Sequence, residues 1–165
     1  MIQKKVCMVG TFAVGKTSLV RQFVESVYAD KYHTTVGVKV DKKIVVVGEQ
    51  EVTLVLWDIE GAETGHELRQ SYLRGAAGYL LVADGTRPDT IAKAEELQAR
   101  AEATVGSVPF LLLLNKVDLG EHWRVDPDEL ARLRALNWLV ITTSAKTGQG
   151  VEMAFATLAQ KIMGD

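Results

Sequence analysis

The sequence predicts an α/β fold in which a mostly parallel sheet is covered by helices on both faces. Short apolar runs alternate with helical patterns along the chain, as in folds built from strand–helix–strand units. A single hairpin interrupts this alternation, at the turn Gly48-Glu49-Gln50. The chain has 165 residues and three prolines, which fits one domain spanning 1–165 without a flexible linker. Ligands of such sheets bind beyond the carboxyl ends of the strands.

Strands are expected where apolar residues run continuously or alternate between turn signals. They are expected at 6–9, 38–47, 52–58, 78–83, 110–114 and 139–143. Helices are expected where apolar residues recur at helical spacing, at 18–26, 67–74, 90–105, 126–135 and 151–163. Asp126 followed by Pro127 places a capping side chain and a helix-starting proline at the head of one helix. Cys7 lies in an apolar run and is expected to be buried in a strand.

The composition is that of an ordinary globular protein, with 47% hydrophobic and 24% charged residues. The net charge of −2 gives no general attraction to nucleic acid or to an anionic membrane. The single cysteine excludes an internal disulfide and suits a reducing cytosol, so a cytoplasmic location is expected. No apolar run approaches the roughly 20 residues of a membrane span, and no cysteine near the C-terminus offers a lipid anchor, so no direct membrane anchor is expected.

The segment Gly10–Thr17 (GTFAVGKT) matches the phosphate-loop (P-loop) pattern G-x-x-x-x-G-K-[ST], between an expected strand and an expected helix. Its backbone N–H groups are expected to form a nest for nucleotide phosphates. Lys16 is expected to reach the β- and γ-phosphates, and the Thr17 hydroxyl to ligate magnesium. The candidate phosphate-binding residues are Ala13, Val14, Gly15, Lys16, Thr17 and Ser18.

Two later segments supply candidate ligands for magnesium and the γ-phosphate. Asp58 and Gly61 form a D-x-x-G pattern after an apolar strand, so Asp58 can hold magnesium through water and the Gly61 N–H can bind the γ-phosphate. Thr35 lies in the loop after the first helix and is a candidate magnesium ligand, with Thr34 as the neighbouring alternative. The candidate metal ligands are Thr17, Thr35 and Asp58, and the candidate catalytic residues are Lys16, Thr35 and Gly61.

The segment Asn115–Asp118 (NKVD) follows an apolar strand and predicts a guanine site. A carboxylate at Asp118 can accept hydrogen bonds from the ring N–H and the exocyclic amine of guanine, whereas adenine would leave it unpaired. Asn115 is expected to tie loops together, and the aliphatic stem of Lys116 to lie along the base. After the last strand come Ser144, Ala145 and Lys146, and the Ala145 N–H can meet the guanine carbonyl. Tyr28 is a candidate cover for the edge of the base.

Together these motifs resemble the Ras superfamily of small GTPases over essentially the whole chain, and the segments 31–37 and 71–78 look Rab-like. The resemblance implies a P-loop small G domain with a six-stranded sheet and five helices, which cycles between GDP and GTP forms with Mg²⁺. The loops around Thr35 and 61–72 would then be the two switches, which contact effectors, an exchange factor and an activating protein. The compact chain without a lipid-bearing tail resembles bacterial or archaeal members.

Three residues depart from the family pattern, and two of them, Ala62 and Phe12, predict slow intrinsic GTP hydrolysis. Ala62 stands where a glutamine usually orients the attacking water, Phe12 stands where a small residue is usual, and Glu60 precedes the D-x-x-G glycine. An alternative is an interaction module that binds GTP without hydrolysing it. The NKVD segment and the absence of an acceptor-substrate domain argue against a third reading, a P-loop nucleotide kinase.

A further hypothesis is that a nearby side chain takes over the role of the missing glutamine. The candidates are Glu60, Glu63, His66 and, as an arginine finger from the same chain, Arg69. The more ordinary interpretation of all four is solvated surface. Arg87, in the segment 84–88 (DGTRP), is likewise interpreted as an ordinary loop charge.

Overall fold

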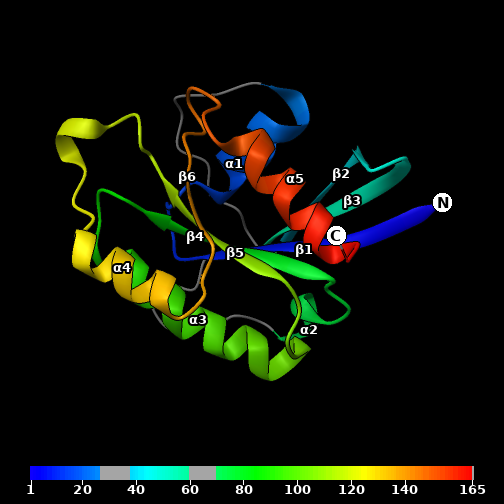
Figure 1. Cartoon of the computed structure of the whole chain (residues 1–165). Coiled ribbons are helices and arrows are strands. Elements are labelled where there is room, and N and C mark those ends of the chain that lie inside the picture. Colours follow the sequence, from blue (N-terminus) through cyan, green and yellow to red (C-terminus); the bar gives the residue numbers. More distant parts are fainter. Residues whose placement is uncertain (27–37, 60–69, 165) are drawn as a thin grey trace.

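The structure is a computed structural model that describes residues 1–26, 38–59 and 70–164. Within these ranges the chain forms one six-stranded sheet with the strand order β2-β3-β1-β4-β5-β6 (Figure 1). The strands are β1 (Ile2–Gly10), β2 (Val38–Val47), β3 (Gln50–Ile59), β4 (Gly78–Asp84), β5 (Phe110–Asn115) and β6 (Val140–Thr142). The pair β2–β3 is antiparallel and the other four pairs are parallel, which confirms the predicted sheet.

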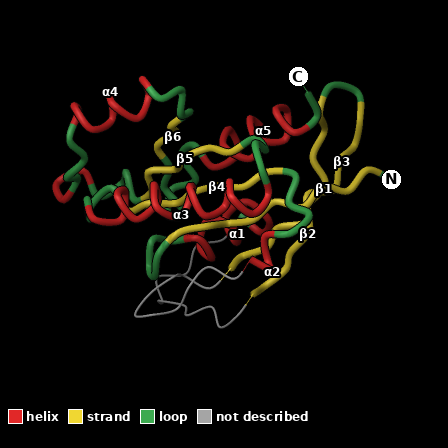
Figure 2. Tube along the Cα trace, turned by 90° about the horizontal axis from the view of Figure 1, so that it is seen from below, coloured by secondary structure: helices red, strands yellow, loops and turns green. Residues whose placement is uncertain are grey.

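Helices cover both faces of the sheet, as expected. They are α1 (Lys16–Glu25), α2 (Gln70–Leu73), α3 (Asp89–Val105), α4 (Pro127–Ala135) and α5 (Val151–Ile162), with a short 3₁₀ turn η1 (Gly120–His122). The helices α1 and α5 lie on one face, and α2, α3 and α4 lie on the other (Figure 1). Figure 2 shows α4 and β6 at one end of the molecule and the β2–β3 hairpin at the other.

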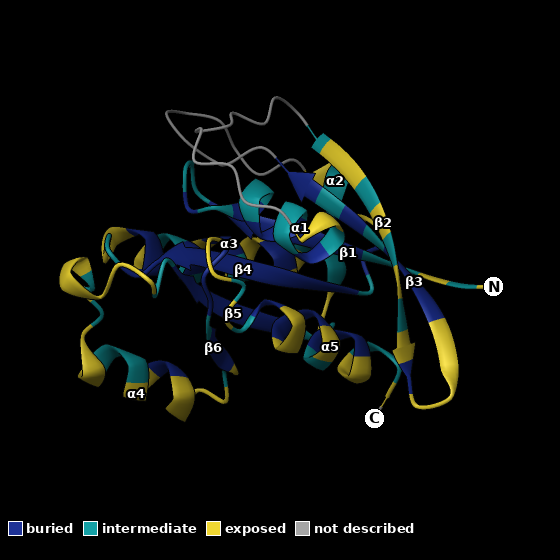
Figure 3. Cartoon of the chain, turned by 90° about the horizontal axis from the view of Figure 1, so that it is seen from above, coloured by how far each residue is buried: buried dark blue, intermediate teal, exposed yellow. Residues whose placement is uncertain are grey.

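Alternating side chains of the central strands build two hydrophobic cores. Val6 and Met8 of β1 pack with α1 and α5, whereas Cys7 and Val9 pack on the opposite face with α3. This is the period-two alternation of a strand whose two faces are both covered. Figure 3 accordingly shows the central strands as the most buried part of the molecule.

The element boundaries differ from the expected ones in a few places. The first helix begins at Lys16, two residues before the expected start at 18, because the P-loop runs directly into it. Val47 pairs with Gln50, so the hairpin turn contains only Gly48 and Glu49, and Gly48 has the positive φ of 63° that two-residue turns favour. The expected helix at 67–74 is described as α2, and residues 67–69 lie outside the described residues.

The capping signal before α4 is confirmed. The Asp126 carboxylate accepts a hydrogen bond from the backbone N–H of Asp128 at 2.9 Å, and Pro127 occupies the first helical position. Of the helices in the described ranges, none has both the length and the apolar character needed to cross a bilayer.

Candidate functional site

Four described loops gather at the carboxyl end of the parallel strands. Because β1, β4, β5 and β6 run in the same direction, the segments that follow them emerge at one edge of the sheet. Among them are the P-loop after β1, the segment 85–88 after β4, the NKVD segment at the end of β5 and the segment 143–150 after β6. This edge is therefore where the predicted motifs meet.

The P-loop has a backbone that only certain residues adopt without strain. Gly15 has φ 104°, and a Cβ built on it would lie 2.3 Å from Nδ2 of Asn115, so both conformation and space require glycine. Ala13 has φ 61° and is one of four described non-glycine residues with positive φ. A side chain in this left-handed region costs roughly 1 kcal/mol or more, so neighbouring contacts must hold the loop in place.

Lys16 extends along the P-loop from the start of α1. Its Nζ donates hydrogen bonds to the carbonyls of Gly10 at 3.0 Å and Thr11 at 2.9 Å. Burial lowers the pKa of Lys16 to about 8; the charge of Asp58 opposes this shift and that of Arg87 adds to it. A buried cation surrounded by carbonyl oxygens is suited to meet an anionic ligand at this loop.

Thr17 and Asp58 bring two oxygen ligands together from distant parts of the chain. The Thr17 hydroxyl donates to Oδ2 of Asp58 at 2.5 Å, and Asp58 is buried near the end of β3. Magnesium prefers hard oxygen ligands, often one or two from the protein completed by water and phosphate oxygens. The donor set at this point therefore fits the predicted magnesium ion.

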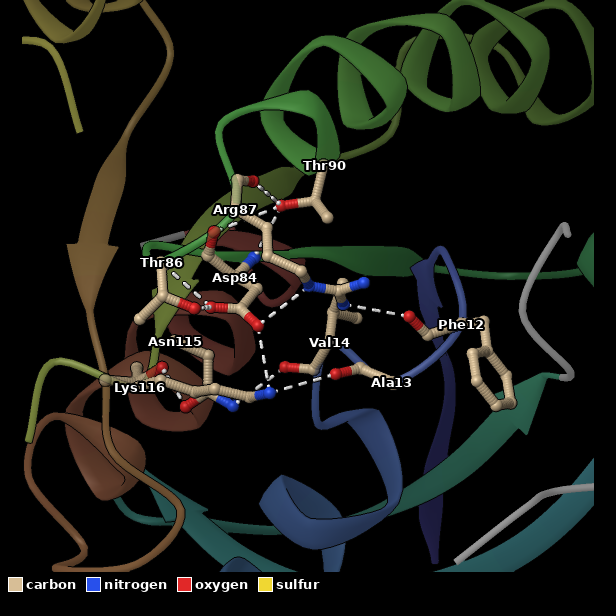
Figure 4. Close-up of polar contacts among 10 residues, drawn as sticks. Phe12, Ala13, Val14, Asp84, Thr86, Arg87, Thr90, Asn115 and Lys116 are labelled. Atoms are coloured by element: carbon tan, nitrogen blue, oxygen red, sulfur yellow. Dashed lines mark hydrogen bonds and ion pairs between the residues drawn. The ribbon is translucent and has the colours of Figure 1, made fainter. Parts of the chain in front are cut away.

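Side chains of two other loops hold three consecutive carbonyls of the P-loop (Figure 4). The hydrogen bonds run from Asn115 Nδ2 to Val14 O (3.0 Å), from Lys116 Nζ to Ala13 O (3.1 Å) and from Arg87 Nη2 to Phe12 O (3.0 Å). The amide oxygen of Asn115 in turn accepts from the Thr143 hydroxyl at 3.1 Å. The expectation that Asn115 ties loops together is confirmed.

A buried carboxylate at the end of β4 joins two of these side chains. Oδ2 of Asp84 lies 2.9 Å from Lys116 Nζ and 3.1 Å from Arg87 Nε, while Oδ1 accepts two hydrogen bonds from Thr86. The Asp84 side chain is only 1% exposed. Burial alone would raise the pKa of Asp84, but the hydrogen bonds from Thr86 and Lys116 outweigh it, and the pKa lies below its ordinary value.

The segment after β6 orients the predicted base-recognition carboxylate. The Ser144 hydroxyl donates to Oδ1 of Asp118 at 2.8 Å and accepts from the Thr147 backbone N–H at 3.0 Å. Ala145 is buried, and its carbonyl accepts from Gln22 of α1 at 2.8 Å, whereas Lys146 is exposed. Asp118 and Ala145, predicted from separate motifs, are thus neighbours at one side of the site.

The packing of Trp123 on Gly85 adds two residues to the surroundings of the predicted site. A Cβ built on Gly85 would lie 2.0 Å from Cζ3 of Trp123, so the tryptophan ring lies directly on the glycine. The backbone N–H of Arg124 donates to the Gly85 carbonyl at 2.8 Å. The loop after β5 is therefore fastened to the loop after β4, next to Asp84.

Several predicted residues lie outside the described residues. They are Tyr28, Thr34, Thr35, Glu60, Gly61, Ala62, Glu63, His66 and Arg69. Ser18 is described at the start of α1, with a partly exposed side chain.

One interpretation was wrong, and one residue was missed. Arg87 is not an ordinary loop charge, because it donates to the P-loop carbonyl of Phe12 and pairs with Asp84. Asp84 was not considered as a site residue. The signal for it was a carboxylate at the end of a wholly buried strand, where a charge must be paired.

Comparison with known proteins agrees with this geometry. A family model described as "Ras family" matches residues 5–164. Ras-related protein Rab-25 of Homo sapiens is 37% identical over 164 residues, which cover 96% of this chain and 75% of that protein, and Rab-25 of Oryctolagus cuniculus gives the same values. Ras-related protein Rab-4A of Homo sapiens is 36% identical over 161 residues, covering 96% of this chain and 74% of that protein.

The fold and the site define a small G domain of the P-loop class. The chain belongs to the Ras family, and its similarity to the two Rab proteins makes it Rab-like. Members of this family are GTPases that act as GTP-binding switches. They bind GTP and GDP with Mg²⁺, and they interact with regulators and effectors.

Proposed function

We propose that this protein is a molecular switch that binds GDP and GTP with Mg²⁺ and hydrolyses GTP slowly on its own. The observation that carries the proposal is the meeting of three motifs at one edge of the sheet. The P-loop carbonyls of Ala13 and Val14 are held by the two residues that begin the NKVD segment, and Thr17 meets Asp58. Phosphate, metal and base contacts would therefore be made by one connected set of loops.

The residues would divide the work as follows. Backbone N–H groups of 13–18 and the Lys16 ammonium would bind the phosphates, and Thr17, Asp58 and Thr35 would hold magnesium. The magnesium ion would supply charge neutralisation between the β- and γ-phosphates. The base would be recognised by Asp118, Ala145 and the neighbouring residues, which are Asn115, Lys116, Ser144, Lys146 and Tyr28. Lys16, Thr35 and Gly61 would stabilise the γ-phosphoryl group during transfer.

Slow hydrolysis follows from the side chains at two positions. Ala62 has no polar group with which to orient a water molecule, and Phe12 places a large ring in the P-loop. Phosphoryl transfer depends on positioning and charge stabilisation, and an arginine supplied by a partner contributes about 10³–10⁵ in rate. We expect a partner that engages the switch loops to supply the missing groups.

Two experiments test this proposal. Nucleotide extracted from the purified protein and separated by chromatography should be GDP or GTP, and adenine nucleotides instead would overturn the guanine assignment. Single-turnover hydrolysis at saturating Mg²⁺ should proceed at or below about 10⁻⁴ s⁻¹, the scale of unassisted Ras. A rate well above that value would contradict the slow cycle.

A second candidate function is a module that binds GTP and signals without hydrolysing it, favoured by the same two residues, Ala62 and Phe12. Phosphate release measured with and without host lysate discriminates the two candidates. Stimulation by the lysate supports the switch, whereas no release in either condition supports the module.

The substitution Ala62→Gln separates the missing glutamine from other causes of slow hydrolysis. It should raise the intrinsic rate by an order of magnitude, because an amide that orients water is restored. Ala92→Gln on the exposed surface of α3 is a matched control and should leave the rate unchanged. If alanine at Glu60, Glu63, His66 and Arg69 each leaves the wild-type rate unchanged, none of these residues replaces the glutamine.

The finer assignments of partners and place rest on the sequence. We expect contacts with effectors, an exchange factor and an activating protein through the switch loops, and no binding of nucleic acid. Bacterial or archaeal origin, a cytoplasmic location and a single G domain over 1–165 stay predictions. The net charge of −2 also predicts no general attraction to an anionic membrane, and strong pelleting of the purified chain with anionic liposomes would contradict that.

A further inference from the structure

Arg87 connects the P-loop to a buried charge without belonging to any of the nucleotide-binding motifs. Its Nη2 donates to the Phe12 carbonyl at 3.0 Å, and its Nε lies 3.1 Å from Oδ2 of Asp84 (Figure 4). One planar guanidinium therefore bridges a backbone acceptor and a carboxylate from two different loops. A fixed fork of N–H donors is suited to such bridging, whereas a lysine ammonium is not.

The backbone beneath Arg87 is firmly held. Its N–H donates to the Asp84 carbonyl at 2.9 Å, and its carbonyl accepts from the Thr90 hydroxyl at 2.7 Å. The Thr90 hydroxyl also accepts from the Asp84 N–H at 2.8 Å, which closes the loop between β4 and α3. The guanidinium therefore extends toward the P-loop from a backbone position that is fixed by hydrogen bonds.

Fixing the Phe12 carbonyl also fixes the next N–H group. In a trans peptide the C=O of one residue and the N–H of the following residue point in opposite directions. With the Phe12 carbonyl turned toward Arg87, the N–H of Ala13 is turned away from it. Lys116 and Asn115 act in the same way on the next two peptides, whose N–H groups belong to Val14 and Gly15. These three N–H groups are among the proposed phosphate donors.

We propose that Arg87 is a positioning residue that locks the Phe12–Ala13 peptide of the P-loop and thereby slows the release of guanine nucleotides that carry a β-phosphate. This inference rests on the proposed function. Arg87 acts from behind the loop: Figure 4 shows its guanidinium on the carbonyl side of Phe12, with the phenyl ring directed away from it. It is therefore not a catalytic arginine. Through Asp84, which also binds Lys116, the same guanidinium links the phosphate loop to the base-binding segment.

The inference predicts a selective effect of Arg87→Ala on nucleotide binding. Loss of a hydrogen bond from a charged group corresponds to about a 10- to 100-fold change in an equilibrium constant. The variant should weaken GDP binding by that factor, mostly through faster release, and should change GMP binding less than about twofold, since GMP has no β-phosphate. Arg87→Lys keeps the charge but loses the fork, and should fall between the wild type and the alanine variant.

The test measures dissociation rates and affinities of GDP and GMP for the full chain in Mg²⁺, with thermal unfolding of each variant. Arg100→Ala, an exposed arginine of α3, is the matched control and should behave as the wild type. A drop in the GDP-to-GMP affinity ratio for Arg87→Ala alone supports the inference. An unchanged GDP-to-GMP affinity ratio, whether or not both affinities fall, overturns the inference and leaves the proposed function intact. Failure of the wild type to bind GDP overturns the proposed function and this inference with it.

Discussion

The hydroxyl of Thr17 at the start of α1 donates to the carboxylate of Asp58 near the end of β3, across 2.5 Å. The two residues come from different motifs, and their oxygens meet beside the P-loop lysine. Such a pair holds a position in which a divalent cation can be shared, because both oxygens are hard ligands. If magnesium binds at this contact, the rate of nucleotide release should depend on Mg²⁺.

Thr17→Ala should remove the magnesium dependence of GDP release. In the wild type, chelation of Mg²⁺ by EDTA should accelerate GDP release about 10-fold or more. The bound metal stabilises the GDP complex, and its removal takes that stabilisation away. The alanine variant should release GDP rapidly with or without EDTA. Thr17→Ser keeps the hydroxyl and is the control; a response to EDTA in the alanine variant equal to that of the wild type would contradict the metal assignment.

Asp118→Ala should reduce the preference for guanine. A site whose buried polar groups match a ligand rejects the analogue that leaves them unpaired, so the affinity ratio of GDP to ADP should fall at least about 100-fold. Ser144→Ala removes only the hydroxyl that orients the carboxylate, at 2.8 Å, and should lower the ratio less. Competition binding measures both. A ratio that survives in Asp118→Ala would show that other groups read the base.

Gly85→Ala should displace the Trp123 indole, because the added Cβ would lie 2.0 Å from a ring carbon. Overpacking of this kind costs typically about 1–3 kcal/mol, so the midpoint of urea unfolding should fall and tryptophan fluorescence should change. Gly120→Ala adds the same methyl group where no atom lies within 4 Å and where φ is not in the left-handed region, and should alter neither measurement. Equal behaviour of the two variants would contradict the described packing.

Cys7 should be almost unreactive in the folded protein. Burial raises the pKa of its thiol to about 12 from 9.0, and the charge of Lys5 only partly opposes this. Thiol labelling with Ellman's reagent at pH 8 should therefore be at least about 100-fold slower in buffer than in denaturing urea. As the chain's one cysteine, Cys7 is the source of the whole signal.

The same pKa shift sets the direction of a change in stability with pH. Above about pH 9 the unfolded chain loses the thiol proton while the folded chain retains it until about pH 12. Ionisation then favours the unfolded state, so this group lowers the free energy of unfolding as pH rises from 9 to 12. Cys7→Ala should show a smaller decline over that interval in urea titrations. An equal decline would contradict the shift.

Much of the fold and of the candidate site could be predicted from the sequence, because the signals are local. The run Phe110–Leu114 is apolar without interruption, as expected for a strand covered on both faces, and it forms β5. The P-loop pattern fixes glycine at position 15, where both φ and the neighbouring Asn115 require it. The strand depends on residues that are adjacent in the sequence, and the P-loop conformation at position 15 requires glycine.

The contacts made by Arg87 and Trp123 could not be predicted in the same way. Arg87 donates a hydrogen bond to the backbone carbonyl of Phe12. Because every residue carries a backbone carbonyl, no residue type at position 12 indicates this acceptor. Trp123 fills space above Gly85 only because two loops after different strands approach each other. The loops around Thr35 and Ala62 lie outside the described residues, so those parts of the site rest on the motifs alone.

The central place of β1 in the sheet has a consequence for how the chain folds. β1 is the first strand in the sequence, yet its neighbours are β3 and β4, and Val6 lies opposite Gly78. Only the β2–β3 hairpin can form by local contacts, and the rest of the sheet requires the closure of long loops. Loop closure costs entropy before the contacts repay it, so folding should be slower than for an all-helical protein of this size. The ligand-binding edge draws on segments from Gly10 to Gly150, and it is complete only once nearly the whole chain has folded.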